Sequence, residues 1–302
     1  MPATTSRPVH SPVWSNPRAA RNQTSLPPDR LLHSGNAGML IHRVGMLTYA
    51  MARQGRDFSV DLLGYMNQAQ AGAATTFCYE EVFGVRDRLH WLVHLKSPDA
   101  YGRLLEMVDH DADYQDISVG DRLPEDEGGG NWEKMFVEGS LRETILCAQH
   151  GLTHGDDGHD GDTFVPPARF QTTQPVDEQL NSANAGAIVL RTADVKYEFR
   201  KEGRKFLFDW QTFVNDALPG RVTAYLYEQT WGRQDRVHCL IQLRSLDDYQ
   251  AVVELDRGDE LRKAVYDLER VPLSKGGGGW GQLFVPASMH DVLLVPHLTG
   301  TP

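Results

Sequence analysis

The stretch "DRLHWLVHL" at residues 87–95 decides the fold, because its pattern returns as "DRVHCLIQL" at residues 235–243. Apolar and polar side chains alternate in the first stretch, as they do in a strand with two different faces. The first copy carries His90 and His94, whereas the second keeps His238 and has Gln242 at the other position. The sequence therefore contains two copies of one predicted strand, which differ in having a histidine or a glutamine at the second polar position.

The repeat extends far beyond this strand. Residues 31–150 align with residues 179–298 without a gap, with about 38 identical residues in 120 positions. "FCYEEVFG" aligns with "YLYEQTWG", and "GGGNWEKMFV" with "GGGGWGQLFV". Two copies are too few for a solenoid, which needs three or more. We therefore expect a tandem duplication with four parts: a disordered N-terminal tail (1–30), a first repeat (31–150), a linker (151–178) and a second repeat (179–302).

Each copy predicts the same order of elements. A long apolar strand comes first, followed by a helix with apolar residues at three-to-four spacing that ends at glycine. Two strands rich in aromatic and branched residues form a hairpin, a second helix follows, and a glycine-rich loop leads to the last strand. This β-α-β-β-α-β order is that of the ferredoxin-like unit. The predicted fold class is α+β, with two such units packed through their sheets.

Composition limits the classes of partner. The net charge of −11 argues against a nucleic-acid binder, which needs a basic surface. No apolar run reaches the roughly 18 residues of a membrane span, and the N-terminus lacks the apolar segment of a secretory signal. Three cysteines cannot form a full disulfide framework, which favours a reducing cytoplasm.

In element order and duplication, the chain resembles the dimeric α/β-barrel superfamily, which includes antibiotic-biosynthesis monooxygenases, polyketide cyclases and chlorite-dismutase-like haem proteins. The resemblance covers about 80% of the chain and rests on no signature motif. It implies a fused pseudo-dimer with helices outside and a pocket between or beneath the sheets. A homodimer of the fused unit is a further option.

The hairpin predicts one polar–aromatic face in each repeat. If the turn is "GVRD" (84–87), Phe83 pairs with Arg88 and position 81 with position 90. The other face is apolar and suits helix packing, so the polar–aromatic face should line the barrel and hold a planar ligand. The residues expected on this face are Phe77, Tyr79, Glu81, Phe83, His90 and His94, then Tyr225, Tyr227, Gln229, Trp231, His238 and Gln242.

From this set we expect His90, His94 and Glu81 to be catalytic, because they are the titratable groups of the first repeat. The expected substrate-binding residues also include Arg43 and Arg191, which stand mid-strand at matching positions and need a partner. The alternative for each histidine is a structural hydrogen-bonding role. We expect no metal site, since a cluster of histidines and aspartates at 154–162 lies between glycines in the solvated linker.

The leading hypothesis is a cofactor-independent cyclase of natural-product biosynthesis, acting by acid–base catalysis on a reactive aromatic or polyketide-like intermediate, including intermediates of carbazole type. Three alternatives remain open. The first is a cofactor-free monooxygenase of the same fold, and the second is a haem protein with a histidine ligand. The third is a non-catalytic carrier of a small aromatic molecule, because the same cavity would serve binding alone.

Overall fold

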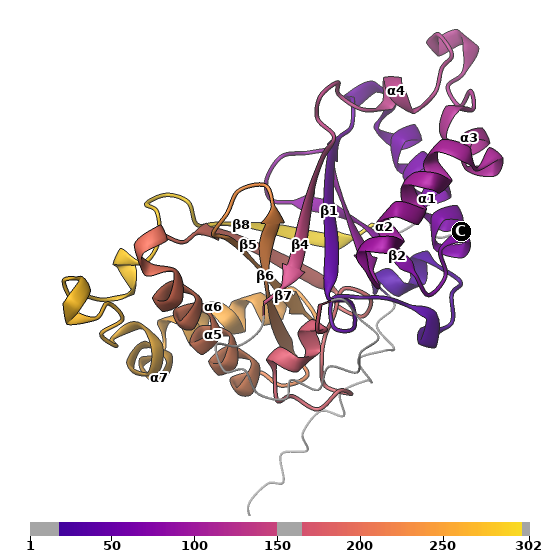
Figure 1. Ribbon diagram of the computed structural model, residues 1–302. Coiled ribbons are helices and arrows are strands. Elements are labelled where there is room, and N and C mark those ends of the chain that lie inside the picture. The colour runs from indigo at the N-terminus through magenta and orange to yellow at the C-terminus, as the bar shows by residue number, and fades with distance from the viewer. Residues whose placement is uncertain (1–17, 150–164, 298–302) are drawn as a thin grey trace, which may run out of the picture.

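Eight antiparallel strands form a closed barrel in the computed structural model, which describes residues 18–149 and 165–297 (Figure 1). The strand order around the barrel is β1-β3-β2-β8-β5-β7-β6-β4. Closure leaves no unpaired edge, so every strand has two hydrogen-bonded neighbours. The strands are β1 (Met39–Met46), β2 (Ala74–Val82), β3 (Arg88–Leu95), β4 (Arg142–Ala148), β5 (Ala187–Asp194), β6 (Val222–Trp231), β7 (Arg236–Leu243) and β8 (His290–Pro296).

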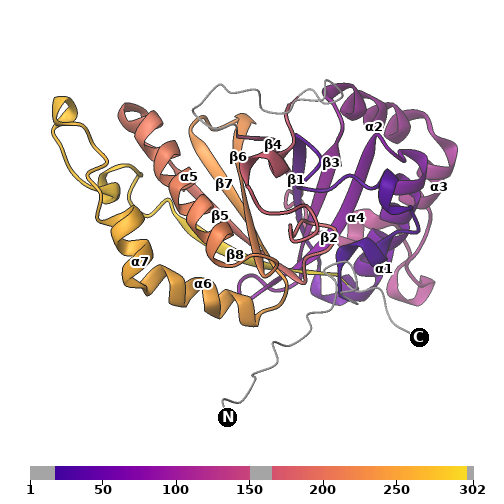
Figure 2. The same cartoon turned by 90° about the horizontal axis from the view of Figure 1, so that it is seen from below.

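Each half of the chain supplies four adjacent strands, β4-β1-β3-β2 and β8-β5-β7-β6. The halves meet at two seams, where β2 pairs with β8 and β4 pairs with β6. The helices of the first half lie on one side of the barrel and those of the second half on the other (Figures 1 and 2). These helices are α1 (Ala52–Ala69), α2 (Pro98–His110), α3 (Ala112–Val119) and α4 (Trp132–Met135), then α5 (Arg200–Ala217), α6 (Asp247–Arg257) and α7 (Asp259–Leu261).

The alternation in β3 divides the barrel interior from the helix layer. Leu89, Trp91, Val93 and Leu95 pack with residues of the helix layer, while Leu92 belongs to the core inside the barrel. His90 and His94 are buried on the same side of the strand as Leu92. The predicted division between a helix-facing and an interior face is therefore observed.

The hairpin register differs from the prediction by two residues. Tyr79 pairs with His90, whereas the proposed turn would have placed position 81 there. Phe83 and Asp87 have φ angles of 56° and 60°, so a wider turn replaces the expected one. A shift of two preserves the side each residue faces, because side chains alternate with a period of two.

Residues 18–30, assigned above to the tail, are partly packed against the barrel. Ala20 is fully buried, and Gln23 donates to the carbonyl oxygens of Cys78 and His297 at 2.7 and 2.8 Å. Gln23 Oε1 also accepts from the Cys78 N–H at 2.9 Å. The amide side chain thus bridges the β2/β8 seam. The signal for this order is a further stretch of the repeat, since "ARNQT" (20–24) recurs as "ARFQT" (168–172).

Gln171 makes the matching bridge at the β4/β6 seam. Its Nε2 donates to the carbonyl oxygens of Gln149 and Leu226 at 2.6 and 2.8 Å, and its Oε1 accepts from the Leu226 N–H. Two equivalent glutamines therefore hold the two seams. Part of the predicted linker is thus ordered structure, while its histidine and aspartate cluster (154–162) lies outside the described residues.

One end of the barrel is closed by the segments that precede β1 and β5. Ser34 and Ser182 exchange hydrogen bonds, each N–H donating to the hydroxyl of the other at 2.9–3.0 Å. Tyr79 OH donates to the Ser182 carbonyl at 2.5 Å, and Tyr227 OH donates to the Ser34 carbonyl at 2.7 Å. All four residues are fully buried or nearly so. The interior is therefore packed solid at this end.

Two local features depart from the predicted elements. The single second helix expected in each repeat is interrupted in the second half: α6 ends at Arg257, and α7 and a π-helical turn (Arg262–Tyr266) follow Gly258. In each half a short helix or 3₁₀ turn stands between the glycine run and the last strand, where the sequence predicts only a loop. Among the described residues, no helix is long and apolar enough to cross a membrane.

Candidate functional site

A cavity of about 540 Å³ lies in the barrel at the end opposite the packed serines. Its size falls within the range of small-molecule sites. Leu190, Val292 and Val44 give it apolar surface, and four histidines supply polar atoms. The complete lining comprises His42, Val44, Met46, Arg88, His90, Val137, Glu138, Gly139, Ser140, Arg142, Thr144, Leu190, Thr192, Arg236, His238, His290 and Val292.

A chain of three titratable side chains reaches this cavity from β2, β3 and β1. Glu81 Oε2 lies 3.2 Å from His90 Nε2, and His90 Nδ1 lies 2.9 Å from His42 Nε2. A carboxylate only accepts, so His90 donates its Nε2 proton to Glu81 and its Nδ1 accepts from His42. The remaining nitrogen of His42, Nδ1, therefore carries a lone pair. A side chain that lines the cavity is thus oriented as a proton acceptor.

The charge states of Glu81, His90 and His42 follow from their burial and from their neighbours. Burial opposes ionisation of Glu81, but hydrogen bonds from His90 and the Val85 N–H, with the charge of Arg88, lower its pKa to about 2. Burial lowers the pKa of His42 well below 6.5, and the neighbouring His90 and His238 lower it further. Burial also lowers the pKa of His90, against the opposing effect of Glu81. At neutral pH the carboxylate is charged and both imidazoles are neutral.

His238, the equivalent of His90 in the second half, has no hydrogen-bond partner for either ring nitrogen within the described residues. It is 5% exposed and lines the cavity. Burial, Arg236 and His290 lower its pKa to about 4, so it is neutral at pH 7. An unsatisfied buried nitrogen costs about 1–3 kcal/mol, and in a cavity it is a candidate for binding a ligand or water.

Three arginines surround the cavity, and two of them are neutralised. Arg88 donates to Glu81 at 3.0 Å, and Arg236 forms a bidentate pair with Asp194. Arg142 forms no ion pair with any described residue and is exposed. The lining therefore combines the neutral imidazoles of His42, His90 and His238 with the exposed cation of Arg142 and the exposed carboxylate of Glu138. The cation can stabilise negative charge that develops on a neutral substrate.

The predicted site residues lie in three places: at the cavity, at the packed end of the barrel, and outside the barrel. Only His90, Glu81 and His238 line the cavity or belong to the hydrogen-bonded series that reaches it. His94 is fully buried at the packed end, with its Nε2 2.8 Å from Ser182 Oγ. Gln242 makes the equivalent contact with Ser34 Oγ at 3.0 Å. The exchange of His94 for Gln242 thus preserves a hydrogen bond to a buried serine. Four aromatic residues, Phe77, Tyr79, Tyr225 and Tyr227, also fill this core.

The remaining predicted residues lie away from the cavity. Phe83 is 89% exposed and Trp231 is 53% exposed, at the outer ends of their hairpins. Arg43 and Arg191 point to the helix side, where they pair with Glu143 and Asp291 respectively. Their partners are therefore carboxylates of the adjacent strands β4 and β8.

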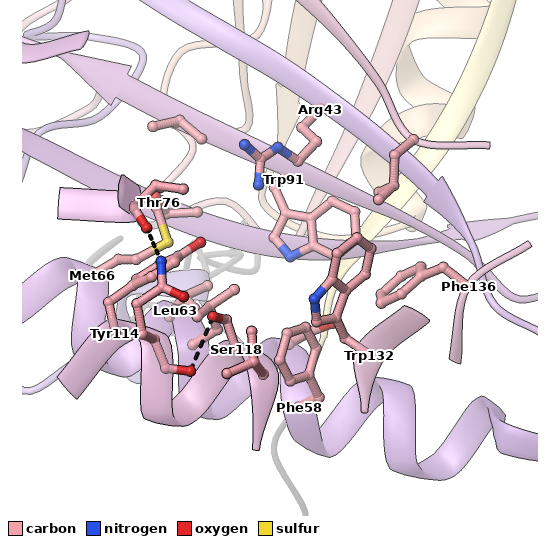
Figure 3. Close-up of a pocket in the computed structure, with 17 residues that line it drawn as sticks. Arg43, Phe58, Leu63, Met66, Thr76, Trp91, Tyr114, Ser118, Trp132 and Phe136 are labelled. Atoms are coloured by element: carbon pink, nitrogen blue, oxygen red, sulfur yellow. Dashed lines mark hydrogen bonds between the residues drawn. The ribbon is translucent and has the colours of Figure 1, made fainter. Parts of the chain in front are cut away.

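A second cavity, of about 290 Å³, lies between the outer face of β1 and β3 and the helices α1 and α3 (Figure 3). Aromatic side chains of Phe58, Trp91, Trp132 and Phe136 surround it, and Arg43 borders it. It is separate from the barrel cavity, since the two share no lining residue.

Sequence reasoning missed His42, although the signal was present. His42 stands in β1 at the position of Leu190 in the second half, so it is a histidine on a face that is apolar in the other copy. The sequence reasoning also missed Thr144, Arg142 and His290. They lie on β4 and β8, the last strands of the two halves, and the strands that neighbour these two depend on how the barrel closes.

The histidines expected from the sequence to bind a haem or a ligand are His90 and His238. A ligating histidine usually donates its other N–H to a carboxylate or carbonyl. His90 has such a carboxylate, but its second nitrogen is hydrogen-bonded to His42, and His238 has no orienting partner among the described residues. Neither of these two histidines, His90 and His238, therefore fits an axial haem ligand. No group of three or more described His, Cys, Asp or Glu side chains is arranged to hold a metal ion.

Solved structures share this fold at low sequence identity. An anthrone oxidase-like protein has a TM-score of 0.51 and 10% identity, over 88% of this chain and 94% of its own. A "putative monooxygenase" from Lactobacillus acidophilus NCFM has a TM-score of 0.50 and 8% identity, over 86% and 93%. A chlorite dismutase from Candidatus Nitrospira defluvii has a TM-score of 0.46 and 11% identity, over 86% and 92%.

The first two likenesses support the α+β barrel fold and nothing finer, because the identities are too low to carry function. No curated protein matches the chain in sequence. A family model, in contrast, matches residues 11–302, nearly the whole chain. The chain belongs to the family of unknown function DUF6039.

Proposed function

We propose that this protein is an enzyme that performs acid–base chemistry on a small aromatic or polyketide-like molecule in the barrel cavity. The observation that carries the proposal is the chain from Glu81 through His90 to His42, which ends on an unprotonated Nδ1 beside the cavity. Such a chain resembles the orienting partners of a general base, which fix the tautomer and stabilise the protonated imidazole.

The proposed step is removal of a proton from an activated C–H bond. The C–H electron pair is delocalised into a conjugated carbonyl and forms an enolate, while the proton passes to His42 Nδ1. His42 becomes an imidazolium whose Nε2–H remains hydrogen-bonded to His90. His90 is in turn bonded to the carboxylate of Glu81, which offsets the new charge. Ring closure, dehydration or aromatisation would then return the proton from His42.

Two features favour a cyclase-type reaction without an added cofactor. The cavity has room for a folded aromatic precursor, and its apolar wall of Leu190 and Val292 excludes water around the reactive intermediate. Arg142 and His238 supply hydrogen-bond donors or polar contacts for a developing oxyanion. The aromatic residues of the packed end do not line this cavity, so the proposal assigns them no substrate contact.

The alternative is a cofactor-free monooxygenase on the same site. The first step would be the same, and the enolate would then transfer electrons to molecular oxygen. The fold likeness to the anthrone oxidase-like protein makes anthrone a suitable probe, because its C–H bond between two rings is activated by a carbonyl. A carrier that only binds remains the third alternative.

The experiment separates these alternatives with one compound. Anthrone is incubated with the full chain in D₂O under nitrogen, and exchange of its acidic C–H for deuterium is followed by NMR. The same mixture in air is followed with an oxygen electrode. We expect exchange under nitrogen to accelerate and the acceleration to fall at least about tenfold in His42→Gln and Glu81→Gln.

The surface variant His110→Gln, at the end of α2, is the matched control and should keep the wild-type rate. Exchange without oxygen uptake supports the acid–base enzyme, whereas exchange with protein-dependent oxygen uptake supports the monooxygenase. Saturable binding without exchange would identify a carrier. Equal exchange rates in wild type and His42→Gln would remove His42 as the base.

We further propose that the two halves arose by tandem duplication and then diverged in chemistry. The support is the aligned identity of the halves together with the paired glutamine bridges of Gln23 and Gln171. Leu190 and Gln229 stand where the first half has His42 and Glu81. The proton-transfer chain is therefore confined to the first half, while His238 is retained as an isolated imidazole.

A further inference from the structure

The two halves differ in how the space between sheet and helices is filled. In the second half this space holds Trp210, which extends from α5 and is 3% exposed. The guanidinium carbon of Arg191 lies 5.2 Å from the centroid of the Trp210 ring, so a cation covers the indole. Trp210 Nε1 donates to Asp256 at 2.8 Å, and the hydroxyl of Tyr266 donates to the same carboxylate.

The first half lacks the residues that fill this space. Leu62 stands at the position of Trp210, Val108 at that of Asp256, and Ser118 at that of Tyr266. All three first-half residues line the 290 Å³ cavity. α1 and α5 have matching bounds, so the helix position does not account for the open volume. The first half lacks two large aromatic side chains here, and the cavity remains open although Trp91 stands where the second half has Cys239. The arginine is kept, because Arg43 borders the cavity at the position of Arg191.

The cavity walls have the chemistry of an aromatic binding site. Figure 3 shows the rings of Phe58, Trp91, Trp132 and Phe136 grouped around one side of the space, with Arg43 above Trp91. Neither indole N–H donates a hydrogen bond to any described residue, so both donors remain available. Arg43 donates to Glu143, which leaves part of its fork free for a ring or an oxygen atom.

We propose that this cavity binds a flat bicyclic aromatic molecule with a hydrogen-bond acceptor, in the place that Trp210 occupies in the second half. The ring would lie beside Arg43, as Trp210 lies beside Arg191, and the acceptor would receive an indole N–H from Trp91 or Trp132. The site is independent of the barrel cavity, so either proposal stands if the other fails. A cavity of this volume is at the small end of ligand sites and suits two fused rings.

The test uses 2-naphthoate, an aromatic carboxylate of the required size. Its binding to the full chain is measured by titration calorimetry and by quenching of tryptophan fluorescence. We expect one saturable site per chain. The double variant Leu62→Trp with Ser118→Tyr introduces the two aromatic side chains of the second half into this space, and it should lower the affinity at least about tenfold.

The control variant is Thr192→Ala, which alters the barrel cavity and should leave naphthoate affinity unchanged. Near-ultraviolet circular dichroism shows whether the filled variant retains its packing. On the wild-type chain, we expect intermolecular NOEs between naphthoate protons and the methyl groups of Leu62 and Leu63. Those NOEs are the measurement that decides the matter if the filled variant does not fold.

Three results would overturn the proposal: no saturable binding at about 1 mM probe, NOEs confined to barrel-cavity methyl groups such as those of Val44, or unchanged affinity in a folded filled variant.

Discussion

His42 Nε2 and His90 Nδ1 lie 2.9 Å apart inside the barrel, with their rings stacked at a centroid distance of 5.1 Å. Two neutral imidazoles at this distance need complementary tautomers, one donating and one accepting. Glu81 determines which histidine donates, because its carboxylate accepts a hydrogen bond from His90 Nε2–H and so leaves His90 Nδ1 as the acceptor from His42. A side chain on β2 therefore sets the proton position on a histidine two strands away.

Replacing Glu81 with glutamine should disturb these tautomers. The variant copies Gln229 of the second half, and its amide does not enforce donation from His90 Nε2. We expect His90 to change from one Nε2–H tautomer to a mixture, read from the ¹⁵N shifts of labelled histidine. Loss of the charge beside Arg88 should also lower the free energy of unfolding by about 1–3 kcal/mol. An unchanged Nε2–H signal at His90 would show that another group holds the tautomer.

The variant His94→Gln should make the protein less sensitive to acid. Burial, with a contribution from His33, holds the pKa of His94 well below 6.5, so the folded state keeps it neutral. Below pH 6.5 the unfolded chain gains a proton that the folded chain does not, and stability falls by about 1.4 kcal/mol per pH unit. The glutamine variant lacks this loss. Between pH 6.5 and 5.0, urea unfolding should show it relatively stabilised by about 2 kcal/mol.

Gln242 provides the reason to expect that this variant folds, since the equivalent glutamine already bonds Ser34 in the other half. At pH 7 the two proteins should differ by no more than about 1 kcal/mol. Parallel stability curves for the variant and the wild type from pH 7 to 5 would mean that His94 titrates normally in the folded protein.

Removal of the Tyr79 hydroxyl should weaken the packed end of the barrel. Tyr79→Phe leaves the Ser182 carbonyl without its donor, at a cost of about 1–2 kcal/mol in unfolding free energy. Tyr227→Phe should cost a similar amount through Ser34, because the contact is equivalent. Chemical denaturation measures both. A large cost for one variant and none for the other would contradict the equivalence of the two contacts.

The glutamine bridges should contribute to closure of the seams. Gln23→Ala removes three hydrogen bonds to Cys78 and His297 and should lower stability by about 1–3 kcal/mol. Amide exchange at Cys78 should accelerate in the variant, while amides in α5 should be unaffected. The exposed residue Asp29 gives the control, since Asp29→Ala should change stability by less than about 0.5 kcal/mol. Equal protection of Cys78 in wild type and variant would deny the bridge a role.

The sequence predicts the architecture well, because period-two alternation and a long ungapped repeat are strong local signals. The facing of His90 and Glu81 follows from alternation alone and survives an error of two in the register. His42 could not be joined to His90 in the same way. Their contact depends on the pairing of β1 with β3, which the strand pattern does not specify.

The same limit explains Arg43, Arg191 and the ordered stretch at 18–30. An arginine in a strand needs a partner, but the sequence does not say that Glu143, 100 residues away, supplies it. Proline and serine content predicts disorder near residue 20, and only comparison with residues 168–172 reveals otherwise. The residues that the local pattern places wrongly are those whose positions depend on contacts between segments far apart in the sequence.

The crossed serines and tyrosines block one end of the barrel among the described residues. A substrate of the proposed site would therefore enter from the opposite end, and its product would leave by the same route. An elongated precursor would extend outward past Arg142 and Ser140. The rim would then decide which tail lengths are tolerated, while the interior would decide which ring system reacts.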